Sequence, residues 1–118
     1  MSHHGERRRY PRAYLDCPAL VQGPGGAKLA EAGNISARGA FIRCEEPLFP
    51  EDRVKLHIMV PDRLALSVDA KVAWLQVRCA ENNSPRCGIG ISFTQISETD
   101  RKFIIALASG LFPSGQQG

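Results

Sequence analysis

The chain has 118 residues, a length that predicts one domain able to bury a core without help from a disulfide or a metal. Hydrophobic residues make up 43% and charged residues 23%, a balance typical of globular proteins that excludes a disordered chain. No apolar run approaches the roughly 20 residues of a membrane-spanning helix, and no apolar stretch after Met1 resembles a signal peptide. We therefore expect a soluble, cytoplasmic protein without a membrane span.

The entire charge excess lies in residues 1–12. This segment contains one acid and four arginines: Arg7, Arg8, Arg9 and Arg12. It therefore carries +3, and the basic and acidic residues of the remaining chain cancel. Pro11 favours extended backbone around it, which lets Arg8 and Arg12 face the same way. We predict a flexible arginine-rich arm over residues 1–12 that meets a local anionic partner, although a solvated basic tail has the same composition.

Two weak strand patterns follow the arm, at residues 14–21 and 28–33, and the glycine-rich turn at residues 23–26 separates them. Next comes Asn34-Ile35-Ser36-Ala37-Arg38-Gly39, directly before a further strand pattern at residues 40–44. Asn34 and Ser36 can hydrogen-bond neighbouring backbone and hold a tight turn. Gly39 permits a positive φ or the close approach of a ligand. Taken alone, this segment also fits an ordinary loop.

Clear alternation of apolar and polar residues predicts three further strands, at residues 54–60, 66–74 and 89–93. Strands joined by turns this short must pair antiparallel, because parallel neighbours need a long crossover. With about six strands, closure into a barrel removes exposed sheet edges. The fold class expected is mainly β: a six-stranded antiparallel β-barrel with a C-terminal α-helix, over residues 13–112.

The C-terminal part changes to helical spacing. Ser97 and Asp100 form a capping-box-like start, and apolar residues then recur every three to four positions from Phe103 to Leu111. Gly110 and Pro113 end the pattern. We expect the helix to pack its apolar stripe on the barrel, and we expect residues 113–118 to be a disordered tail.

The sequence offers few residues suited to catalysis. His3 and His4 lie in the arm, and His57 falls on the polar face of a strand, where surface residues are the rule. No hydrolase, metalloprotease or phosphate-binding loop motif is present. The four cysteines, which show no zinc-ligand spacing, are expected to be reduced and mostly buried. The sequence therefore predicts a binding module and not an enzyme, with no catalytic residue, no metal and no cofactor.

The two singled-out segments together resemble a known family. Arg8-x-x-x-Arg12 followed by Asn34-x-Ser36-x-x-Gly39 is similar to the paired motifs of the PilZ domain, a bacterial receptor for cyclic di-GMP. The Val-Ala-Trp run at residues 72–74 and the Gly-Ile-Gly-Ile-Ser-Phe run at residues 88–93 support the resemblance. It covers the chain from Arg7 to about Gly110.

The resemblance implies both the barrel with its flanking helix and a set of residues that bind cyclic di-GMP. Asn34 stands where many relatives have Asp, and its neutral amide can donate as well as accept a hydrogen bond. Trp74 is a further candidate contact, because relatives can offer an aromatic residue on this strand. Arg7 of the arm is another candidate contact. Strand parity instead favours packing of Trp74 in the core, in line with residues 66–72. The implied ligand-binding residues are Arg8, Arg9, Arg12, Asn34, Ser36 and Gly39.

Arginine suits such a ligand. A guanidinium can fork onto guanine O6 and N7, bind phosphate through charge-assisted hydrogen bonds, and stack on a base. Because the net charge is confined to the arm, we also expect a receptor or adaptor in which ligand draws Arg8 and Arg12 against residues 34–39, so that the arm folds across the barrel mouth and presents a new surface to a protein partner. Motility, biofilm-matrix synthesis, secretion and virulence are outputs that family analogy offers without choosing among them.

Two other classes of function remain open from the sequence. The first is a PilZ-like protein-interaction module that does not bind the nucleotide. The second is a small barrel that binds single-stranded DNA or RNA, which would need an aromatic-rich basic face. The barrel body is neutral and the chain has only one tryptophan and two tyrosines, so no DNA or RNA partner is expected.

Overall fold

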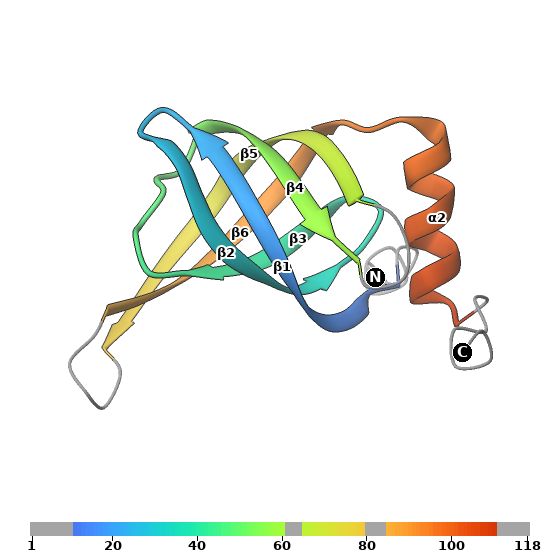
Figure 1. Cartoon of the computed structure of the whole chain (residues 1–118), viewed down its shortest axis with the longest axis horizontal. Helices are drawn as coiled ribbons and strands as arrows, with labels where there is room; N and C mark the ends of the chain where they lie inside the picture. The colour runs from blue at the N-terminus through green and yellow to red at the C-terminus, as the bar shows by residue number, and fades with distance from the viewer. Residues whose placement is uncertain (1–10, 61–64, 80–84, 111–118) are drawn as a thin grey trace, which may run out of the picture.

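Six antiparallel strands close into a barrel in the order β1-β2-β3-β6-β5-β4 in the computed structural model, which describes residues 11–60, 65–79 and 85–110 (Figure 1). One helix follows the last strand, so the barrel-plus-helix fold expected from the sequence is confirmed. The elements are β1 (Ala13–Gly23), β2 (Gly26–Ile35), β3 (Gly39–Cys44), β4 (Arg53–Met59), β5 (Ala65–Cys79), β6 (Pro85–Gln95) and α2 (Glu98–Ala108).

Alternating side chains fill the interior of the barrel. In β4, Val54, Leu56 and Ile58 are buried while the residues between them face outward. Burial of each such side chain contributes about 1.5–3 kcal/mol, which is why the sequence alternation predicts these strands well. Cys44 and Cys87 belong to this core, as expected. The most completely buried side chains include Val21, Ile35, Ile42, Leu56, Val72, Ile89 and Ile104.

β1 and β2 form a long hairpin although their sequence pattern is weak. Gly23 pairs with Gly26 across a two-residue turn, and the φ of +105° at Gly26 is one that glycine adopts without strain. Register shifts interrupt the alternation between Tyr14 and Cys17 in β1, and between residues 32 and 34 in β2. These irregularities obscure the period of two on which the sequence prediction relied.

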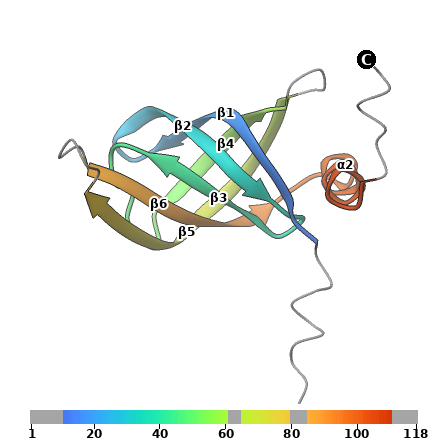
Figure 2. The same ribbon diagram turned by 90° about the horizontal axis from the view of Figure 1, so that it is seen from below.

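Helix α2 stands at one end of the barrel, and the paired ends of β5 and β6 near Cys79 and Pro85 project at the other end (Figures 1 and 2). Ser97 caps the helix: its Oγ accepts a hydrogen bond from the backbone N–H of Asp100 at 3.0 Å. Ile104 is fully buried, so the helix docks through its apolar stripe as predicted. No helix in the described ranges is both long and apolar enough to cross a membrane.

Some expectations concern residues outside the described part of the chain. These are the contacts of Arg7, Arg8 and Arg9, and the disordered tail at residues 113–118. His57 is described, and both of its ring nitrogens have neighbours: Nδ1 lies 2.8 Å from Ser67 Oγ and Nε2 lies 2.9 Å from Gln22 Oε1. It therefore bridges three strands on the outer surface, in agreement with its predicted surface position.

Candidate functional site

Arg12 and Asn34 meet although 22 residues separate them in the sequence. The Nη1 group of Arg12 donates a hydrogen bond to Asn34 Oδ1 at 2.6 Å. The β1–β2 register explains the contact, because Tyr14 pairs directly with Asn34 and Arg12 comes two residues before Tyr14. The hairpin thus joins the end of the arginine-rich arm to the first residue of the Asn-Ser-Gly segment, as the spacing of the two motifs predicted.

Bulges in the strands turn the site residues outward. In β2, Ala32 and Ile35 are both buried although three residues apart, so one extra residue lies between them and Asn34 faces the outer wall. The same break occurs in β5 between Val72 and Trp74. Each bulge therefore moves a polar or aromatic side chain from the expected inner face to the outer face.

The preference for Trp74 as a core residue was wrong. Its side chain is 47% exposed, because the bulge after Val72 reverses the parity of the strand. The indole lies beside Phe41, with ring centroids 5.9 Å apart and planes inclined by 30°. Gly90 makes room for it, since a Cβ at this position would lie 2.2 Å from the indole ring. Trp74 is thus held on the outer wall with one face available to a ligand.

These residues enclose a cleft of about 310 Å³ on the outer wall of the barrel. Arg12, the described end of the arm, lines this cleft. Arg12 is also the one charged group among the described lining residues. A guanidinium, a side-chain amide and an indole face could here bind an anionic, planar, hydrogen-bonding ligand. The lining residues are Arg12, Tyr14, Asn34, Ala40, Phe41, Ala73, Trp74, Gly90 and Ile91.

Ser36 and Gly39 shape the turn that carries Asn34 and do not line the cleft. Ser36 is buried, its backbone N–H donates to the carbonyl of Gly39 at 2.8 Å, and its Oγ accepts from the N–H of Arg38 at 3.2 Å. Gly39 does not have a positive φ. It is required by packing instead, because a Cβ would lie 2.2 Å from the backbone oxygen of Ile91 in β6.

Phe41 and Tyr14 also line the cleft, although neither motif in the sequence pointed to them. Phe41 follows the Asn-Ser-Gly segment directly, and its strand partner is the small residue Gly90. A glycine opposite an aromatic residue is a signal that could have found it, because large rings often lie over such glycines. Among the described residues, no group of three His, Cys, Asp or Glu side chains could hold a metal ion.

The family model for the PilZ domain matches residues 6–110, which is most of the chain. The chain belongs to the PilZ domain family. This PilZ domain has its two motifs in the order of the family and joined by the contact between Arg12 and Asn34. No curated protein matches the sequence.

Solved structures share the fold of this PilZ domain at low sequence identity. The PilZ domain of YcgR from Escherichia coli, solved with c-di-GMP, superposes with a TM-score of 0.73 and 15% identity, over 94% of this chain and 95% of that one. The c-di-GMP complex of MrkH from K. pneumonia superposes with a TM-score of 0.73 and 21% identity, over 93% of this chain and 53% of that one. The Bacillus subtilis inhibitor of motility, MotI/DgrA, superposes with a TM-score of 0.73 and 17% identity, over 89% of this chain and 51% of that one. The chain thus spans about half the length of the MrkH and MotI chains.

Proposed function

We propose that this PilZ domain is a non-enzymatic receptor for cyclic di-GMP that signals to a protein partner. The observation that carries the proposal is the hydrogen bond between Arg12 and Asn34 beside the exposed face of Trp74. The ligand has two phosphates and two guanines, so it needs cationic groups, hydrogen-bonding groups and flat surfaces. The wall cleft and the arm supply all three.

Each residue has a role in this proposal. The guanidinium groups of Arg8 and Arg12, with Arg9 as a helper, bind a phosphate or fork onto guanine O6 and N7. Asn34 holds Arg12 in place and offers its amide to the guanine edge. Trp74 stacks on a base. Ser36 and Gly39 act through the turn, by fixing where Asn34 points.

The proposed output is a change in the position of the arm. The ligand draws Arg8 and Arg12 together against the cleft, and the rearranged arm forms a surface that a partner protein reads. Because a second messenger acts inside the cell, the proposal places the receptor in the cytoplasm. The inhibitor of motility among the structural neighbours makes swimming motility the first output to assay.

Calorimetric titration with cyclic di-GMP tests the proposal. Arg8→Ala/Arg12→Ala should weaken binding on the order of a hundredfold or more, because two charge-assisted contacts are lost. Arg53→Ala/Lys102→Ala removes the same charge from exposed positions elsewhere and should bind like the wild type. Equal heats from the wild type and the arm variant would remove the arm from the mechanism.

Ligand controls separate the proposal from its rivals. Cyclic di-AMP should bind much more weakly, because adenine lacks the O6 acceptor that arginine reads. A mixed-sequence single-stranded oligonucleotide should give no gel shift at physiological salt, since the barrel body is neutral. A shift as strong as the cyclic di-GMP signal would favour a nucleic-acid-binding barrel, and no binding of either would favour a protein-interaction module.

A further inference from the structure

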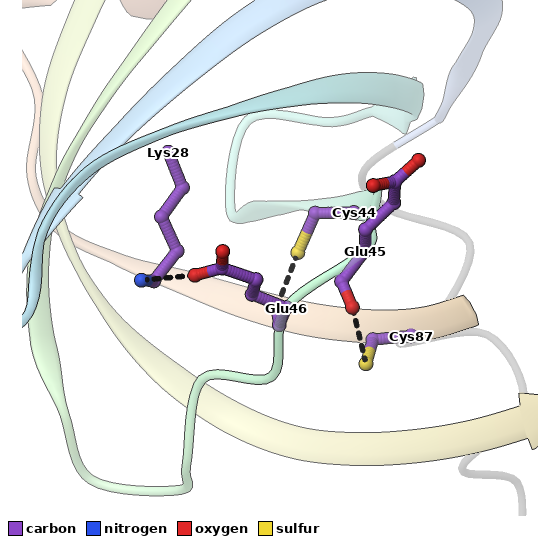
Figure 3. Close-up of polar contacts among 5 residues, drawn as sticks. All are labelled: Lys28, Cys44, Glu45, Glu46 and Cys87. Carbon is purple, nitrogen blue, oxygen red and sulfur yellow. Dashed lines mark hydrogen bonds and ion pairs between the residues drawn. The ribbon is translucent and has the colours of Figure 1, made fainter. Parts of the chain in front are cut away.

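A second cavity, of about 870 Å³, lies at the end of the barrel where β3 stops. It is larger than the wall cleft and shares only Phe41 with it. Strands β2, β3, β5 and β6 line it together with residues 45 and 46 of the link that leaves β3 (Figure 3). None of the roles proposed above uses this end of the barrel.

The cavity exists because the barrel wall is incomplete here. β3 ends at Cys44, which pairs with Cys87 of β6. Residues 26–30 of β2 therefore pair only with β1, and Arg86 of β6 pairs only with β5. Within the described ranges, two strands thus present unpaired edges on either side of the cavity. Unpaired edges are the places where another extended chain can add to a sheet.

Two arginines at this opening have no polar partner among the described residues. Arg78 and Arg86 lie directly opposite each other on β5 and β6, and both are exposed. Like charges in directly opposed positions destabilise a sheet. Neither guanidinium makes a hydrogen bond or ion pair with any described residue. An anion bound between them would relieve the repulsion.

The other basic residues of the cavity are already neutralised. Lys28 Nζ lies 2.8 Å from a carboxylate oxygen of Glu46, and this ion pair ties β2 to the link after β3 (Figure 3). Arg43 Nη2 lies 2.5 Å from Asp16 and 3.4 Å from Glu31. Among the lining residues that the structure describes, the positive charge available to a ligand is therefore that of Arg78 and Arg86.

The lining favours a peptide over a nucleic acid. The cavity lining carries four basic and three acidic side chains, so its small positive excess suits one or two carboxylates held between Arg78 and Arg86 and not a continuous phosphate backbone. The edge of β2 offers backbone hydrogen-bonding groups over five residues, about 17 Å of extended chain. Leu29, which is 82% exposed, lies on this edge and offers apolar contact.

We propose that this opening binds an extended, acidic segment of a partner protein as an added strand along residues 26–30 of β2, with its carboxylates between Arg78 and Arg86. Strand addition supplies affinity through main-chain hydrogen bonds, and the arginine pair supplies the preference for acidic residues. The surface is separate from the wall cleft, so the proposal goes beyond nucleotide binding and is tested on nucleotide-free protein. Failure of one proposal leaves the other standing.

The test titrates a capped seven-residue peptide of alternating glutamate and valine into the ¹⁵N-labelled full chain. Backbone amides of residues 26–30 and of Arg86 should shift, and their hydrogen exchange should slow. Arg78→Glu/Arg86→Glu should weaken binding at least tenfold, whereas Arg53→Glu/Lys102→Glu, with the same change of charge elsewhere, should stay within twofold. A peptide methylated on alternate backbone nitrogens should also bind at least tenfold more weakly, because it cannot donate those main-chain hydrogen bonds.

The single variant Arg86→Glu controls for the possibility that the double variant loses binding only because it is misfolded. It places opposite charges at the paired positions, so the hairpin should become more stable, while the peptide should still lose its anion site. The proposal is overturned if this variant binds normally, if the methylated peptide binds as well as the parent, or if the amides do not shift. Tighter binding of an oligothymidylate of equal charge would reassign the surface to nucleic acid. If the protein formed concentration-dependent dimers that the peptide did not dissociate, the surface would be reassigned to binding a second copy of this chain.

Discussion

Trp74 gives the wall cleft its flat surface, and the residues around it hold the indole in its exposed position. Phe41 supports one side of the indole, and Gly90 beneath it has no side chain to displace it. An aromatic pair of this kind contributes about 0.5–1.5 kcal/mol beyond its buried area. Half of the ring nevertheless stays in solvent, which costs hydrophobic stabilisation that an inward-facing tryptophan would provide. A stacked ligand would recover that loss.

Trp74→Ala should weaken cyclic di-GMP binding by about 1–3 kcal/mol, the range for loss of one base–aromatic stack. The free energy of unfolding should fall by only about 1 kcal/mol, because the indole is half exposed. Calorimetry measures the first quantity and urea unfolding the second. Because Trp74 is the one tryptophan of the chain, wild-type fluorescence should also be quenched during the titration.

Trp74→Phe provides the matched control, since it retains a flat ring and should recover most of the affinity. If Trp74→Ala bound cyclic di-GMP as tightly as the wild type, stacking on this residue would play no part in recognition. An unchanged fluorescence spectrum at saturation would lead to the same conclusion.

Gly39 and Gly90 are both required for packing, but against different kinds of atom. A Cβ on Gly39 would meet the backbone oxygen of Ile91, which cannot move without separating β3 from β6. Gly39→Ala should therefore lower the free energy of unfolding by about 3 kcal/mol. A Cβ on Gly90 would meet the Trp74 ring, which can rotate away. Gly90→Ala should cost about 1 kcal/mol in stability and should lower nucleotide affinity as Trp74→Ala does.

Urea unfolding of the two variants measures the difference, with Gly25→Ala as the reference. At Gly25 a Cβ would meet only the flexible end of Lys28, at 3.5 Å, so its effect should stay within about 0.5 kcal/mol. Equal destabilisation by Gly39→Ala and Gly90→Ala would contradict the distinction between backbone and side-chain obstacles.

At the scale of elements, bulges decide what could be predicted from the sequence. Strands β4 and β6 alternate regularly over their predicted parts, and their positions were predicted within a few residues. β1, β2 and the second half of β5 contain register shifts, so counting by twos fails there. The fold class could still be predicted, because several regular strands suffice to indicate a barrel. The inward or outward direction of the Trp74 side chain could not be predicted, because one extra residue in the strand reverses it.

The candidate site was predictable only in part for the same reason. The motif spacing placed Arg12 and Asn34 together because a hairpin joins them, and hairpins bring distant residues into register. The role of Gly39 in strand packing could not be predicted, since it depends on β6, a strand about 50 residues away. Such long-range contacts leave no local pattern in the sequence.

Helix α2 depends on its cap because it is short and docks mainly through Ile104. Ser97→Ala removes the acceptor for the N–H of Asp100 and should lower the free energy of unfolding by about 1 kcal/mol. The melting temperature should fall by about 4 °C in a domain of this size. Thermal unfolding followed by circular dichroism measures the shift. Thr99→Ala, an exposed change in the first helical turn, should leave the melting temperature nearly unchanged.

The two ends of the barrel differ in how completely their strands are paired. At the helix end the strands are paired on both sides, and the wall cleft lies where bulges in β2 and β5 turn Asn34 and Trp74 outward, with Arg12 hydrogen-bonded to Asn34. At the other end β3 stops early, and the edges of β2 and β6 stand open around the larger cavity. Phe41 lines both spaces, so one side chain touches both surfaces.

The buried thiols should make the stability of the whole barrel depend on alkaline pH. Burial raises the pKa of Cys44, the nearby Cys87 raises it further, and burial also raises the pKa of Cys87. A raised folded pKa means that the folded state keeps its proton longer than the unfolded chain, in which a thiol titrates near pH 9.0. The resulting stabilisation is fully present below that pH and is lost as the pH rises through the folded values.

Urea unfolding of the reduced protein between about pH 8 and pH 10 tests this dependence. The free energy of unfolding should fall with rising pH, and it should fall less steeply in Cys44→Ala/Cys87→Ala, because two of the responsible groups are gone. All other ionisable groups are common to the two proteins, so their contributions cancel in the comparison. Cys17, whose pKa burial also raises, accounts for part of the remaining slope. Parallel stability curves for the two proteins would show that the thiols are not held protonated by the core.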